Sequence, residues 1–173
     1  TAVFESGTTG NGRFATSANA GNTGSGIIST GSVTDLSQLT GSTYAISFSV
    51  DAAGATTYLV TETPPSATPP TPQPYVSGQA ISFGGIQLDI KGNPANGDTF
   101  SVAPSQSQSV FSTISDLLTV LSQPATGEAG QARLTNGLNT ANNNIDNAMD
   151  NVSAVRTSCL LYTSPSPRDV EES

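Results

Sequence analysis

A regular apolar stripe near the C-terminal end constrains this chain more than any other feature. Its members recur at alternating steps of four and three residues: Leu134, Leu138, Ala141, Ile145, Ala148, Val152 and Val155. Heptad spacing of this kind is typical of a coiled-coil seam, which lies along a partner helix. The chain contains no second stripe of comparable length. We therefore expect these seven residues to be the helix-packing surface of a protein that assembles, and the chain to be a piece of a longer protein.

Asparagines occupy much of the remaining surface of this predicted helix. They are Asn136, Asn139, Asn142, Asn143, Asn144 and Asn147, and Gly137 lies among them. Asparagine and glycine are poor helix formers, and an isolated helix of such residues is marginal in water. We therefore expect the packing of the apolar stripe on a partner to stabilise the helix.

The chain before the helical region carries the pattern of β-strands. Apolar and small polar residues alternate through Tyr44–Val50, which predicts a half-buried strand. Further strands are predicted around Tyr58 and Val60, over Ala80–Phe83 and Ile86–Ile90 on either side of a Gly84-Gly85 turn, and over Thr99–Val102. Residues 1–35 are rich in glycine and asparagine, which predicts short strands with many turns.

At Pro104-Ser105 the apolar period changes from 2 to 3.6, which predicts a helix that Ser105 or Ser107 would cap. Its apolar face is Val110, Phe111, Ile114, Leu117, Leu118 and Leu121. Pro124 to Gly127 should end it, and Thr126 should cap the heptad-bearing helix, with Glu128 in the first turn. The predicted fold class is α+β: a mainly antiparallel β domain over residues 1–103 and a helical segment over 104–158.

Six prolines lie between Thr61 and Tyr75: Pro64, Pro65, Pro69, Pro70, Pro72 and Pro74. Proline fixes φ and has no N–H, so residues 61–75 should form an extended surface loop. One interpretation is a ligand for the groove of an SH3 or WW domain. We favour the other, a solvated connection between strands.

Composition excludes several classes of function. The net charge is −8, with 13 acidic and 5 basic residues, so we expect no nucleic-acid partner. No apolar run could cross a bilayer, and we expect no membrane insertion. The chain has no histidine, which excludes a Ser–His–Asp set, and we expect no enzyme and no metal site. The cluster of Asp89, Asn93, Asn96 and Asp98 fits turn chemistry better than a calcium loop.

The C-terminal tail has a different character. From Cys159 to Asp169 the heptad pattern stops, and one reverse translation of this run reads as a common transposase-derived sequencing adapter. We therefore predict that residues 159–173 are translated adapter and read-through rather than native sequence. The underlying nucleotide sequence tests this, because other codons across the run would refute it.

Several segments, in their order, resemble those of bacterial flagellar hook-associated proteins in the flagellin-like family. The first is Asn22-Thr23-Gly24-Ser25-Gly26-Ile27-Ile28, followed by Tyr44–Phe48. The second begins at Ile81-Ser82-Phe83-Gly84-Gly85-Ile86 and ends with Gly97-Asp98-Thr99-Phe100-Ser101-Val102. Gln108–Leu118 and the asparagine-rich helix ending at Arg156 are also similar to the family.

The resemblance implies a structural subunit of the flagellum at the hook–filament junction, needed for filament assembly and motility. It implies type III export, an extracellular location and no cofactor or catalysis. The implied partners are other copies of the protein, neighbouring hook, hook-associated and filament proteins, and a flagellar export chaperone. It also implies that N-terminal helices of the same protein cover the apolar stripe. Flagellin or another hook-associated protein is an alternative within the family. An adhesin or glycan-binding β domain, with Tyr44, Tyr58 and Tyr75 as a sugar platform, is an alternative of another class.

Overall fold

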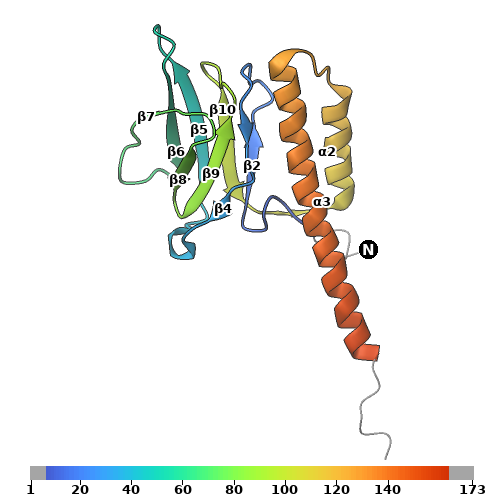
Figure 1. Ribbon diagram of the computed structural model, residues 1–173. Coiled ribbons are helices and arrows are strands. Elements are labelled where there is room, and N and C mark those ends of the chain that lie inside the picture. Colours follow the sequence, from blue (N-terminus) through green and yellow to red (C-terminus); the bar gives the residue numbers. More distant parts are fainter. Residues whose placement is uncertain (1–6, 164–173) are drawn as a thin grey trace, which may run out of the picture.

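The computed structural model describes residues 7–163 of the chain, with side chains as far as Thr157. A β sandwich forms one side of the molecule and a pair of helices forms the other (Figure 1). The part of the predicted non-native tail from residue 164 onward lies outside the described residues, and over residues 159–163 the backbone continues the last helix.

Two antiparallel sheets make the sandwich. The first has the order β2-β10-β5-β6-β7 and is built from Phe14–Ala18, Thr99–Pro104, Thr43–Val50, Thr56–Thr63 and Gln73–Pro74. In the second, β9 (Ile86–Lys91) pairs with β3 (Ile27–Ile28), β4 (Ser32–Val33) and β8 (Ala80–Phe83). A separate two-stranded ladder joins β1 (Gly7–Thr8) to β11 (Ser107–Gln108), and a short 3₁₀ turn, η1, covers Leu36–Gln38.

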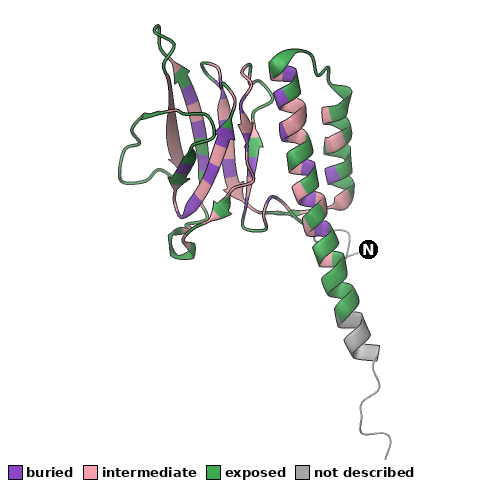
Figure 2. Ribbon diagram, in the orientation of Figure 1, coloured by how far each residue is buried: buried purple, intermediate pink, exposed green. Residues whose placement is uncertain are grey.

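The core lies between the inner faces of the two sheets (Figure 2). The alternation predicted for Tyr44–Val50 is confirmed, because Tyr44, Ile46 and Phe48 are buried, while Ala45 and Ser49 are exposed and Ser47 is partly exposed. The facing sheet contributes Ile81, Ile86, Leu88 and Ile90. Phe48 makes edge-on ring contacts with Phe100 and Tyr75, at centroid distances of 5.7 and 5.1 Å. These are the interactions expected of a sandwich interior.

Two segments that are far apart in the sequence form one hydrogen-bonded unit beside this core. The Asp98 carboxylate is 2% exposed and accepts backbone N–H groups from Thr23, Gly24 and Ala95 at 2.8, 3.0 and 2.9 Å. The Asn22 side chain exchanges two hydrogen bonds, both of 2.9 Å, with the backbone of Thr99. A Cβ atom on Gly24 would stand 2.3 Å from the Ala95 nitrogen, so this close approach requires glycine.

The proline-rich connection lies at the edge of the first sheet, and residues 63–74 are exposed. It is shorter than the predicted 61–75, because β6 runs to Thr63 and β7 pairs Pro74 with Thr57. At its end Tyr75 packs against the core, and its hydroxyl shares its one proton between the carbonyl oxygens of Ile90 and Gly92, each 2.9 Å away. Burial raises the pKa of the Tyr75 phenol. The loop is therefore a solvated excursion that is fixed at both ends.

The start of the helical region differs from the prediction. Ser105 and Ser107 do not cap the first helix, α2 (Val110–Ser122); its N-cap is Ser109, which accepts the Phe111 N–H at 3.2 Å. Ser105 instead donates to the Thr9 carbonyl, and Ser107 belongs to β11. The sequence gives no local sign of these contacts, because the partner strand is about a hundred residues away. The second helix, α3 (Gly127–Thr163), follows Thr126 directly and has Glu128 in its first turn.

Candidate assembly surface

The two helices form a hairpin beside the open edge of the sandwich, where α3 contacts β1, β2 and β3 (Figure 1). Covering a strand edge with a helix is a common way to protect it from pairing with other chains. Gly137 allows the two helices to approach closely, since a Cβ atom there would lie 2.5 Å from a Val120 methyl carbon. The C-terminal part of α3 projects past the sandwich.

The apolar stripe of α3 is divided between buried and exposed positions. Ala141 and Ala148 are buried, and Leu134 and Ile145 are partly buried. Leu138, Val152 and Val155 are each 36% exposed, and the neighbouring Met149 is 63% exposed. The structure therefore places all seven stripe residues on α3, with Leu138, Val152 and Val155 exposed and the other four buried or partly buried in this chain.

A second apolar row lies on α2. Thr113, Leu117 and Val120 are its more covered positions, while four large apolar side chains are exposed: Phe111, Ile114, Leu118 and Leu121. Their exposed fractions range from 44 to 72%. The spacing of three, four and three residues puts these four on one side of the helix. We call the exposed rows of α2 and α3 together the apolar helix face. Exposed apolar surface of this extent is typical of protein interaction sites.

The opposite side of α3 is polar, and it is the side that packs on the sandwich. Asn136 and Asn144 are each only 7% exposed and hydrogen-bond to the β domain, as do Asn143 and Asn147. This corrects the expectation that packing of the apolar stripe alone would stabilise the helix. Propensity marked these asparagines as unfavourable, whereas the spacing of Asn136, Asn143 and Asn147 by seven and four residues puts these three on one side of the helix.

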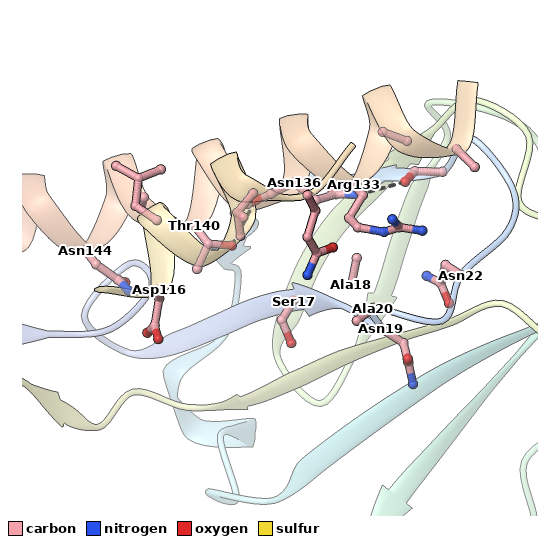
Figure 3. Close-up of a pocket in the computed structure, with 18 of the residues that line it drawn as sticks. Ser17, Ala18, Asn19, Ala20, Asn22, Asp116, Arg133, Asn136, Thr140 and Asn144 are labelled. Atoms are coloured by element: carbon pink, nitrogen blue, oxygen red, sulfur yellow. Dashed lines mark hydrogen bonds between the residues drawn. The ribbon is translucent and has the colours of Figure 1, made fainter. Parts of the chain in front are cut away.

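A cavity of about 230 Å³ lies between this side of the hairpin and the loop after β2. Figure 3 shows Arg133 and Asn136 reaching from α3 toward the strand that carries Ser17 and Ala18. Its walls combine small residues such as Ala129 and Ala132 with polar side chains that include Asp116 and Arg133. Among the described residues, no three His, Cys, Asp or Glu side chains lie together so that they could hold a metal ion.

The other residues that the sequence singled out serve the backbone or the core. Asp98 and Asn96 accept backbone N–H groups, those of Thr23 and Val50 among them. Tyr44 is buried, and Tyr58 and Tyr75 pack against the core, so these rings do not form a sugar platform. Within the described part of the chain, no helix is long and apolar enough to cross a membrane.

A β sandwich with an attached helical hairpin and an open apolar helix face defines a structural protein of the assembling type. Residues 17–104 match the family model of the D2-like domain of flagellar hook-associated protein 1, and the chain belongs to this family of flagellar hook-associated proteins.

The chain is also similar to solved structures of flagellar proteins. The flagellar junction protein FlgL from Legionella pneumophila is 31% identical and superposes with a TM-score of 0.80 over 90% of this chain and 50% of its own. The FlgL of Xanthomonas campestris is 29% identical, with a TM-score of 0.79 over 90% of this chain and 49% of its own. The chain thus spans about half the length of these proteins. No curated protein sequence matches it.

Proposed function

We propose that this protein is a structural subunit of the bacterial flagellum at the junction between hook and filament, needed for filament assembly and motility. The observation that carries the proposal is the apolar helix face on a hairpin that is joined to a β sandwich. The similarity over nine-tenths of the chain to two solved FlgL proteins, one of them described as a flagellar junction protein, supports the same role. The family supports a place in the flagellum, and we propose that this place is extracellular and reached by type III export.

The proposed partners follow from the open surface. Helices of the same protein outside these 173 residues would cover the stripe from Leu134 to Val155, and other copies and neighbouring hook, hook-associated and filament proteins would lie beyond them. A flagellar export chaperone is a further proposed partner. We propose a structural rather than a catalytic role, because the solved proteins that this chain resembles include a flagellar junction protein.

Another hook-associated protein is the second candidate, since the matching family model carries the name of hook-associated protein 1. The two candidates share the proposed assembly surface. Complementation separates them, because the full-length protein should restore motility only in a strain that lacks its own counterpart among the hook-associated proteins.

The proposal is tested by placing a charge in the stripe. Ile145→Asp in the full-length protein is expected to abolish junction assembly and motility, because a carboxylate cannot be buried against a partner helix without a compensating partner. The β domain should remain folded, since Ile145 lies outside its core. Swimming in soft agar, electron microscopy of flagella and circular dichroism of the purified protein measure the three outcomes.

Asn139→Asp is the matched control, because it introduces the same charge at an exposed position of the same helix. It should leave motility and filament number unchanged. Normal swimming in the Ile145→Asp strain would refute the role of the stripe in assembly.

A further inference from the structure

The asparagine side of α3 makes an unusual joint with the β sandwich. Four side chains reach across it: Asn136, Asn143, Asn144 and Asn147. The Asn136 oxygen accepts the Ile28 N–H at 3.0 Å, and its amide nitrogen donates to the Gly26 carbonyl at 2.9 Å. Both backbone groups belong to the edge formed by β3 and the residue before it. The Asn136 amide thus takes the place of a peptide group on a neighbouring strand.

The other end of the joint meets β1 and the turn after it, which leads into β2 of the sandwich. The Asn144 oxygen accepts the Gly10 N–H at 2.9 Å, and the Asn147 amide donates to the carbonyls of Thr8 and Gly10. Between the two ends, Asn143 donates to the Thr30 hydroxyl at 3.0 Å. The contacts from Asn136 to Asn147 extend along about 16 Å of helix, at about 1.5 Å per residue. A helix held at two such points cannot pivot about either of them.

Apolar packing does little to fix the angle of the helix here. The buried α3 residue Ala132 on this side is small, and the cavity of about 230 Å³ separates part of the hairpin from the sandwich. Hydrogen bonds are directional, whereas contacts between small apolar groups are not. The amides therefore supply the geometric constraint at this joint.

We infer that Asn136, Asn144 and Asn147 are positioning residues, which hold α3 at one angle to the β sandwich and so present the apolar helix face in one direction. The angle of the helix is inferred from the hydrogen bonds alone. The partner that the apolar helix face contacts rests on the proposed function. Loss of these amides should leave both parts folded and let their relative orientation vary.

The test combines Asn136→Leu and Asn144→Leu in the 173-residue chain. Both substitutions leave backbone groups of the edge without partners, so amide exchange at Ile28 and Gly10 should rise by about tenfold or more. Exchange at the core amide of Phe48, which pairs with the Asp98 carbonyl, should not change. Residual dipolar couplings should fit one common alignment tensor for helix and sandwich in the parent, and two different tensors in the variant.

Asn139→Leu with Asn142→Leu is the matched control, because both asparagines are exposed on the same helix. This variant should keep one tensor and the parent exchange rates. A single tensor in the Asn136/Asn144 variant, with unchanged exchange at Ile28 and Gly10, would overturn the inference. These readouts need no flagellum, so they are independent of the Ile145→Asp motility test, which addresses the proposed function.

Discussion

Phe100→Ala is expected to remove about 3–5 kcal/mol from the free energy of unfolding of the β sandwich. The ring is 1% exposed, meets Phe48 edge-on, and lies so close to Gly26 that a Cβ there would be 2.7 Å from it. Truncating a buried aromatic ring loses its transfer free energy and leaves a cavity that tight surroundings cannot close. The total free energy of unfolding of a domain of this size is about 5–15 kcal/mol, so the variant should be only marginally stable.

Urea unfolding of the 173-residue chain measures this effect. Tyrosine fluorescence is a suitable probe, because the sequence has no tryptophan and three of its four tyrosines pack in or on this core. Phe111→Ala is the matched control, since that ring is 72% exposed on α2. Its unfolding free energy should change by no more than about 0.5 kcal/mol. Equal shifts of the urea midpoint in the two variants would contradict the placement of Phe100 in the core.

The strands of this fold were predictable where a single face is buried. The alternation in Tyr44–Val50 and Ile86–Ile90 fixes which side chains enter the core, and glycines mark the turn between β8 and β9. These are local signals, set by the two-residue period of a strand and by the positive φ that glycine allows. The α+β class followed from the change of period after Pro104.

Most of the differences from the prediction are contacts between distant parts of the chain. β1 and β11 are two residues each, too short for a period, and they exist because Gly7–Thr8 meets Ser107–Gln108. Because Ser107 belongs to this ladder, α2 begins later than predicted and Ser109 is its N-cap. The asparagines of α3 looked like unfavourable helix residues, because propensity counts the helix alone and ignores strand edges that reach it in the fold. The sequence spacing indicates that these asparagines lie on a common side of α3. It does not indicate which backbone groups of the β domain they bind.

The family motif around Asp98 was visible as a pattern, but its physical reason was not. In the sequence, Gly97-Asp98-Thr99-Phe100 is only a turn followed by a strand. In the structure the carboxylate joins that turn to Thr23 and Gly24, and Thr99 exchanges hydrogen bonds with Asn22. The two segments that resemble the family are thus joined by these hydrogen bonds. We call the unit formed by Asn22, Thr23, Gly24, Ala95, Asp98 and Thr99 the Asp98 clasp. The predicted turn role of Asp98 is present in its bond to the Ala95 N–H, and the bond to Thr23, 75 residues away in the sequence, is an additional contact that the sequence did not indicate.

Asp98→Ala is expected to cost about 3–5 kcal/mol, comparable to the loss of the Phe100 ring. Three backbone N–H groups around the carboxylate would lose their acceptor in a site that water barely reaches, since Asp98 is 2% exposed. Each buried donor left without a partner costs about 1–3 kcal/mol, and bonds to a charged acceptor lie at the upper end. The amides of Thr23 and Gly24 should also lose protection from hydrogen exchange, because the loop after β2 is no longer held.

Asp51→Ala separates this effect from the ordinary role of aspartate in turns. Asp51 also accepts backbone N–H groups, from Ala53 and Ala55 at 2.9 and 2.8 Å, but it is exposed at the tip of the β5–β6 hairpin. Water can replace its carboxylate, so its loss should cost about 1 kcal/mol or less.

Asp98→Asn should lower the unfolding free energy by an amount between those of the two alanine variants, because its single amide oxygen can serve only part of the three donors. Urea midpoints in the order Asp51→Ala, Asp98→Asn, Asp98→Ala, from highest to lowest, are therefore expected. Equal losses of unfolding free energy in Asp51→Ala and Asp98→Ala would show that burial does not explain the large contribution of Asp98.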